Sequence, residues 1–169
     1  IGTFVATLSM AAGVYSQSSN PHITKVYEYR PAPGQFVNTM PEWEEGDGEA
    51  EMIAKCEELL VGDDASMVCL GAYGGYITFG FDHPLVNVPG QYDLFIKGNA
   101  FISSSADDGG NSEPGIVMVS VDDNGNGLPD DEWYELSGSA DVDSVGKVDY
   151  GYEITYTYAP MESVPWTDN

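Results

Sequence analysis

The sequence contains few positively charged residues, and this scarcity excludes several classes of function. Of 169 residues, 5 are Lys or Arg and 28 are Asp or Glu, which gives a formal net charge of −23. Nucleic acids and anionic lipid surfaces both require cationic side chains that neutralise phosphates. We therefore expect no nucleic-acid partner. The acidity suits a hard divalent cation with oxygen ligands, or it simply keeps an exported protein soluble.

Long apolar runs, histidine and cysteine are also scarce. No run approaches the ~20 residues of a transmembrane helix, so we expect no direct membrane insertion of this chain. The two histidines, His22 and His83, are too far apart in the sequence to have the spacing of a zinc site. The two cysteines, Cys56 and Cys69, leave two alternatives open: a disulfide in an exported chain, or two separately buried thiols.

Apolar runs broken by turn residues predict a mostly β fold. The 20 Gly and 10 Pro fall between short β-branched and aromatic segments. This pattern is typical of an antiparallel β-sandwich or jelly roll. One short amphipathic helix is predicted over about 49–61, because apolar residues recur there at helical spacing. The predicted strands are 23–30, 67–70, 76–81, 91–97, 115–121, 133–136 and 150–158.

The chain length predicts one domain. At 169 residues the chain is close to the size of a single compact unit with its own core. We interpret residues 21–169 as a single β-sandwich domain. Residues 1–20 carry no charge and are mildly apolar, without the basic start of a signal peptide. We interpret them as an N-terminal tail or as the remnant of a preceding domain.

One acidic segment matches a motif whose mechanism is understood. Residues 122–132 read DDNGNGLPDDE and contain the D-x-[DN]-x-[DN]-G start of a calcium-binding loop. Ca²⁺ takes six to eight oxygen ligands, which alternate side chains of a tightly curled loop can supply. The glycine at the sixth position permits the sharp turn. The expected ligands are Asp122, Asn124, Asn126, the Leu128 carbonyl, Asp130, and a further carboxylate from Asp131 or Glu132.

The flanks of this segment differ from those of an EF-hand. Trp133 stands where an EF-hand carries its bidentate Glu, so Asp131 or Glu132 would have to replace that ligand. Strand-like segments precede and follow the loop, which predicts a structural calcium site in a β-hairpin. The alternative is an acidic Asn-Gly turn without a metal, since such turns are common for backbone reasons alone.

A few other side chains are weaker candidates for ligand contact. Aromatic rings offer an apolar face and a polar tip to sugars or flat ligands, and Trp43, Trp133 and Tyr73 are candidates of this kind. Trp43 lies in an acidic loop and is the one most expected to be exposed. His83 and Glu113 are polar candidates, but each is also explained as a turn or hairpin residue next to a proline.

Several stretches together carry a resemblance to a known family: 23–38, 74–83, 98–101, 113–136 and 166–169. The most specific reads EPGIVMVSVDDNGNGLPDDEWYEL. They resemble secreted cell-surface proteins of Bacteroidetes, some with PKD-like domains and many encoded near TonB-dependent uptake systems. The resemblance implies export, anchoring as an outer-membrane lipoprotein and a β-sandwich body. It also implies truncation at the C-terminal end, because members continue past WTDN, and it carries over no catalytic residue.

Three functions are compatible with these features. The leading hypothesis is a calcium-stabilised binding module on the outer cell surface, which captures a nutrient, a glycan or a corrinoid without catalysis. The second is a glycan hydrolase that uses carboxylates such as Glu113 and Asp82, which would have to face each other in a cleft. The third is a structural surface spacer. The expected partners are a small molecule or glycan, and a second copy or complementing chain.

Overall fold

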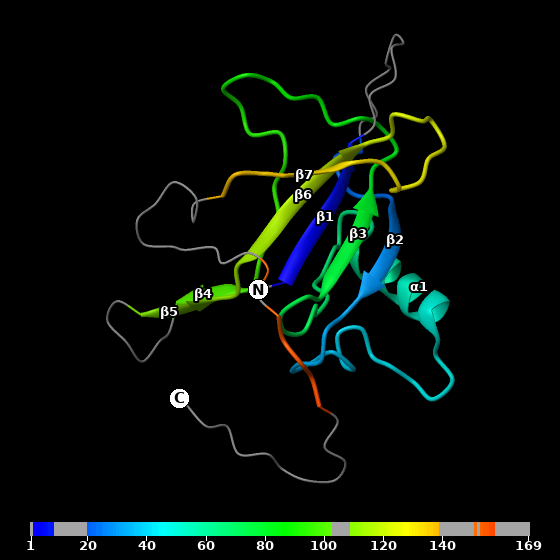
Figure 1. Cartoon of the computed structure of the whole chain (residues 1–169), viewed down its shortest axis with the longest axis vertical. Coiled ribbons are helices and arrows are strands. Elements are labelled where there is room, and N and C mark those ends of the chain that lie inside the picture. Colours follow the sequence, from blue (N-terminus) through cyan, green and yellow to red (C-terminus); the bar gives the residue numbers. More distant parts are fainter. Residues whose placement is uncertain (1, 9–19, 103–108, 139–150, 152, 158–169) are drawn as a thin grey trace.

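The fold is mostly β, as the sequence predicts. The computed structural model describes residues 2–8, 20–102, 109–138, 151 and 153–157. Within them lie seven strands and one helix, arranged as Figure 1 shows. Their bounds are β1 Gly2–Leu8, β2 Lys25–Arg30, α1 Glu49–Leu60, β3 Tyr76–Gly80, β4 Ala100–Ile102, β5 Gly110–Ser112, β6 Gly115–Val121 and β7 Trp133–Glu135.

Five of the strands form one mixed sheet in the order β2-β3-β1-β6-β7. β2 pairs antiparallel with β3, and β7 with β6, but β1 runs parallel to both of its neighbours. Our expectation of antiparallel pairing is therefore wrong for β1. The parallel pairs join segments that are distant in the sequence, and the local alternation of side chains does not encode the direction of such a pairing.

The N-terminal strand lies in the middle of this sheet. Residues 3–6 pair with 76–79 of β3, and residues 2–8 pair with 115–121 of β6. The segment that the sequence suggested as a tail or remnant thus contributes a central strand. The division of the chain at residue 20 stays a prediction.

Four predicted strands occur, two do not, and the seventh lies partly outside the described residues. β2, β3, β6 and β7 fall inside the predicted ranges, whereas 67–70, 91–97 and the described part of 150–158 form no strand. Within 91–97 the Tyr92 and Phe95 side chains are almost fully exposed, so alternation there does not mark a buried face. The short antiparallel pair β4–β5 was missed, because three-residue strands carry no periodic signal.

The helix packs its predicted apolar face against β2 and β3. α1 begins after Gly48, whose backbone N–H donates to the Glu51 carboxylate at 3.0 Å. The core combines side chains from the sheet, the helix and the loops. Figure 1 shows α1 beside β2 and β3. No helix in the described ranges is long and apolar enough to span a membrane. The buried core residues are Val26, Tyr29, Cys56, Val68, Leu70, Ile77 and Phe79, with Met52, Ile53, Leu59 and Leu60 packed against them.

Polar contacts from two residues of the edge strand β2 fix the helix to this strand. The Val26 N–H, which faces away from β3 at a bulge, donates to Glu57 of α1 at 2.9 Å. At the other end of β2, Arg30 forms two contacts with the Glu49 carboxylate, at 2.9 and 2.8 Å. The helix therefore covers an edge that would otherwise present free backbone groups to other chains.

The glycine-rich segment 71–75 allows two backbones to approach closely, as its composition suggests. A Cβ atom on Gly71 would lie 1.8 Å from the Ala32 carbonyl oxygen, and the residue has a φ of +73°. The Ala32 N–H donates to the Leu70 carbonyl at 3.0 Å across this contact. Only glycine fits such a position.

The two cysteines are both free thiols in this structure. Cys56 is fully buried, and its burial raises the thiol pKa to about 12. Cys69 is partly exposed and donates its S–H to the Gln35 carbonyl at 2.9 Å. Of the two alternatives left open by the sequence, the structure has the separate thiols, although only Cys56 is fully buried.

Candidate functional site

The predicted metal-binding segment forms the turn of a β-hairpin. Residues 122–132 connect β6 to β7, which pair antiparallel with Ser120 opposite Trp133. The Leu136 N–H donates to the Val117 carbonyl at 2.9 Å and continues the ladder. Figure 1 shows this turn in yellow at one end of the sheet. The prediction of a hairpin rather than a helix–loop–helix is confirmed.

Side-chain oxygens inside the turn organise its backbone. The two Asp122 carboxylate oxygens accept the N–H groups of Asn126 and Gly127, at 3.0 and 2.9 Å. Asn124 Oδ1 accepts the Asn126 N–H at 2.9 Å, and Asn126 Oδ1 accepts the Leu128 N–H at 2.7 Å. These consecutive Asx turns fold the side-chain oxygens of alternate positions back onto the backbone of the turn. The accepting oxygens thus come from positions 122, 124 and 126 of the turn.

The polar side chains of the turn also converge on one another. Asn126 Nδ2 lies 3.2 and 3.0 Å from the two Asp130 oxygens, and Asn124 Nδ2 lies 3.1 Å from Asp130 Oδ1. Asn124 Nδ2 is also 3.3 Å from Asp131 Oδ1. The hydrogen bonds from Asn126 and Asn124 hold the pKa of Asp130 below its usual value. The Asp130 and Asp131 carboxylates therefore both lie within hydrogen-bonding distance of the Asn124 amide group.

Asp131 and Glu132, the two alternatives for the last ligand, lie in different surroundings. Asp131 Oδ2 is buried and has no hydrogen-bond partner among the described residues. Glu132 is exposed, and its Oε2 accepts the Tyr134 hydroxyl at 2.9 Å, which raises the Tyr134 pKa. The carboxylate that faces the turn is thus Asp131.

The atoms of the turn that could bind a metal are of more than one chemical type. Among the residues that the structure describes, no three His, Cys, Asp or Glu side chains form a group that could hold a metal. Any ion held by the turn would rely on Asn oxygens and backbone carbonyls as well as on carboxylates. Such oxygens are ordinary calcium ligands.

Replacement of Gly127 should disturb the turn through its backbone conformation alone. Its φ is +72°, in the left-handed region, and nothing lies within 4 Å of the position a Cβ would take. We expect Gly127→Ala to lower the free energy of unfolding by about 1 kcal/mol through backbone strain. Gly98 also has open space but no positive φ, so Gly98→Ala is the matched control. Equal urea midpoints for both variants would contradict this reading.

The remaining candidates do not form a second polar site with each other. His83 Nδ1 lies 2.7 Å from Asp82 Oδ1, and its ring meets Phe81 edge-on. Tyr73 is 52% exposed, and its carbonyl accepts the Tyr156 hydroxyl at 2.9 Å. Trp133 is half-buried at the start of β7. None of these side chains contacts the hairpin carboxylates through a hydrogen bond that the described residues show.

Asp82 and Glu113, the proposed hydrolase pair, lie at opposite ends of the sheet. Asp82 follows β3 and Glu113 precedes β6, and both strands run parallel to β1. The C-terminal end of β3 pairs with Ala6 of β1, and the N-terminal end of β6 pairs with Gly2 of β1. These two positions of β1 lie roughly 13 Å apart at ~3.3 Å per residue. A glycosidase needs its two carboxylates about 5–10 Å apart. The structure does not bring this pair together.

Trp43 borders a groove that sequence reasoning did not find. The groove has a volume of about 430 Å³ and lies where the end of β2, the loop before α1 and the first turn of α1 meet. Trp43 is 46% exposed, as expected for a ring in this acidic loop. Arg30 and Glu49 line the same groove, but they are 19 residues apart, and no local pattern links them.

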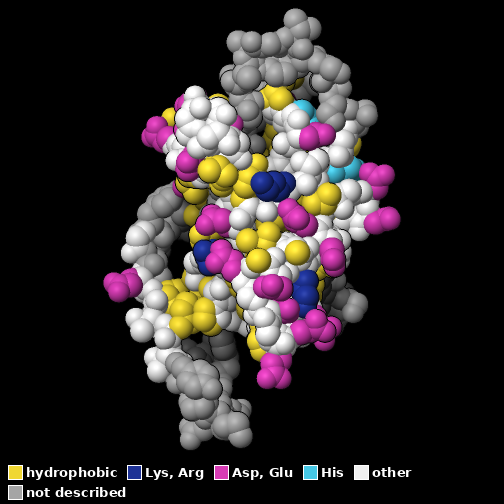
Figure 2. All heavy atoms as spheres, turned by 90° about the vertical axis from the view of Figure 1, so that its right-hand side faces the viewer, with side chains coloured by type: hydrophobic (Ala, Val, Ile, Leu, Met, Phe, Trp, Pro, Cys, Tyr) yellow, Lys and Arg dark blue, Asp and Glu magenta, His cyan; other side chains and the backbone are white. Residues whose placement is uncertain are grey.

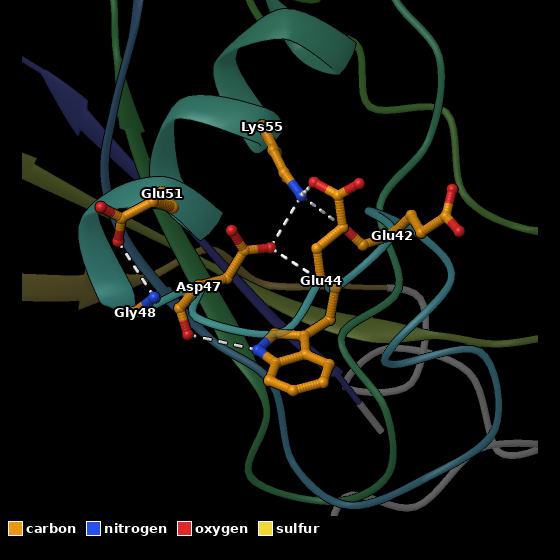
Figure 3. Close-up of polar contacts among 7 residues, drawn as sticks. Glu42, Glu44, Asp47, Gly48, Glu51 and Lys55 are labelled. Carbon is orange, nitrogen blue, oxygen red and sulfur yellow. Dashed lines mark hydrogen bonds and ion pairs between the residues drawn. The ribbon is translucent and has the colours of Figure 1, made fainter.

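A lysine organises the acidic loop beside this groove. Lys55 donates to Glu44 and Asp47 at 3.1 and 2.7 Å and to the Glu42 carbonyl at 2.9 Å, as Figure 3 shows. The Lys55 hydrogen bond lowers the pKa of Asp47. Helical spacing alone assigns Lys55 to the solvent face, but the loop folds back over it.

Comparison with known proteins adds no assignment. No protein-family model matches the chain, and a search of curated proteins finds no match. The functional argument therefore depends on the hairpin turn and the groove themselves.

Proposed function

We propose that the protein is a calcium-stabilised binding module and that residues 122–132 hold the ion. The observation that carries the proposal is the set of side-chain oxygens that fold back onto the turn, together with a buried carboxylate oxygen of Asp131 without a hydrogen-bond donor among the described residues. A buried unpaired carboxylate oxygen costs free energy, and a cation is a partner that removes this cost.

The charge of the turn supports a cation over a bare turn. Five of its eleven residues are Asp or Glu, and none is Lys or Arg. The Asn amide groups supply hydrogen bonds to these carboxylates but no positive charge. A divalent ion would offset the mutual repulsion, which hydrogen bonds alone leave in place.

The lone pairs of the turn allow coordination without loss of its hydrogen bonds. Asn124 Oδ1 and Asn126 Oδ1 each accept one backbone N–H, and an amide oxygen has two lone pairs. Asp122, Asp130 and Asp131 add charged oxygens. Ca²⁺ accepts such irregular sets of carboxylate, amide and carbonyl oxygens, whereas Mg²⁺ demands near-octahedral geometry. We therefore propose Ca²⁺ as the ion.

The wider role follows from the groove and from the acidity. An aromatic-bordered concavity favours ligand capture over a purely structural spacer. Figure 2 shows acidic side chains spread over the α1 side of the molecule among few basic ones, as suits an exported protein. We place the module on the outer surface of a bacterial cell, as a non-catalytic module for nutrient, glycan or corrinoid capture. Its β-sandwich or jelly roll would be completed by another segment or chain.

Direct titration tests the metal site. We expect calorimetry with CaCl₂ to give one site per chain, with a Kd in the range of 10⁻⁴ M typical of extracellular calcium modules. MgCl₂ should bind at least about tenfold more weakly, because the irregular oxygen set suits the larger ion. Heat no greater than dilution with either salt would contradict the site.

A further inference from the structure

The groove next to Trp43 has the features of a ligand site that the hairpin does not explain. Its volume of about 430 Å³ lies within the range of small-molecule sites. Its walls combine aromatic and apolar surface with planar polar side chains. The wall residues used below are Trp43, Arg30, Asn38, Asp47 and Glu49.

Trp43 is held in position although nearly half of it is exposed. Its indole Nε1–H donates to the Asp47 carbonyl at 3.2 Å, and its backbone N–H donates to the Asn38 carbonyl at 3.0 Å. Asp47 is in turn fixed by Lys55 at 2.7 Å and by the Glu44 N–H at 2.8 Å. Figure 3 shows the contacts of Asp47 with Lys55 and Glu44 at the start of α1. An aromatic face fixed in this way loses little conformational entropy when a ligand covers it.

The charged side chains that line the groove, Arg30, Asp47 and Glu49, each contact a group of opposite charge. Glu49 is paired with Arg30, and Asp47 with Lys55. Lys55 also contacts Glu44, and the loop as a whole carries more carboxylates than cations. The overall charge disfavours an anionic ligand, and both carboxylates in the groove wall are already paired with a cationic side chain. A neutral ligand therefore fits best.

We propose that this groove binds a neutral saccharide, with one face of a sugar ring against the Trp43 indole. The C–H face of a sugar suits an aromatic surface, and its hydroxyls can bond to planar groups such as Arg30, Glu49 and Asn38. The inference rests on the binding-module part of the proposed function and names its ligand class. It does not depend on the metal.

The test measures binding of a panel of neutral oligosaccharides by calorimetry and by tryptophan fluorescence. The panel covers α-glucan, β-glucan, mannan and xylan fragments. We expect Trp43→Ala to weaken binding of the saccharide that binds the wild type by at least about tenfold. The matched control is Tyr92→Ala, which removes another exposed ring outside the groove and should leave affinity unchanged. Trp43→Phe, which keeps a ring but loses the Nε1–H donor, should retain part of the affinity.

The outcomes separate this inference from the metal site. Binding lost in Trp43→Ala, with circular dichroism and melting unchanged, supports the groove. Absence of binding for the whole panel, equal affinity in Trp43→Ala, or preference for an anionic glycan or a corrinoid overturns it. Saccharide binding that persists in a protein without any response to calcium supports the groove and contradicts the metal site.

Discussion

Chelation of calcium is expected to lower the melting temperature by about 5–11 °C. A ligand that binds only the native state stabilises it by about 2.7 kcal/mol when its concentration is 100 times Kd. For a chain of 169 residues, each kcal/mol shifts the melting temperature by about 2–4 °C. The measurement compares melting curves in 10 mM CaCl₂ with curves in excess EDTA. The hairpin β6–β7 should lose amide protection first, because the turn connects its two strands.

Magnesium provides the control for this experiment. Equal ionic strength from MgCl₂ screens the acidic surface as well as CaCl₂ does, but it should restore little of the melting temperature. If EDTA leaves the curve unchanged, or if magnesium and calcium protect equally, the turn holds no specific calcium ion. The acidic residues would then serve only to keep the protein soluble.

The sequence predicts local structure well where one physical signal dominates. The helix has its apolar face at a period of 3.6, and it occurs at Glu49–Leu60, as predicted. The hairpin around residue 126 follows from turn chemistry between two apolar runs. In contrast, residues 91–97 alternate in hydropathy but form no strand, because alternation does not supply a neighbouring strand with which to pair.

The sequence does not reveal which segments that are far apart along the chain lie next to one another in the fold. β1 lies between β3 and β6 through pairings that span about 70 and 110 residues, and no local pattern specifies them. The groove is similar, since Arg30 and Trp43 line it from segments that are separate along the chain. The different surroundings of Asp131 and Glu132 also required the structure, because the two adjacent residues have like chemistry but different partners.

The difference between these two residues leads to the sharpest test, which is a pair of neighbouring charge-neutral variants. We expect Asp131→Asn to weaken calcium binding on the order of 100-fold, since removing the charged partner of a desolvated ion costs about 3 kcal/mol. At 10 mM calcium the stabilisation would fall to about 0.4 kcal/mol, so the melting shift would nearly vanish. Glu132→Gln should keep the full shift, because Glu132 contacts Tyr134 and not the interior of the turn.

The same pair has a second readout that a purely structural role would not produce. In EDTA, Asp131→Asn should melt at the wild-type temperature or above it, because the substitution removes a charged, donor-free buried oxygen. In calcium the order of the melting temperatures should invert, so that Asp131→Asn melts below the wild type. For Glu132→Gln, the Tyr134 pKa should return toward its ordinary value, which ultraviolet titration of tyrosine can follow and which verifies the lost charge. If Glu132→Gln abolishes the calcium shift and Asp131→Asn does not, Glu132 is the ligand, and the orientation of both side chains changes when the ion binds.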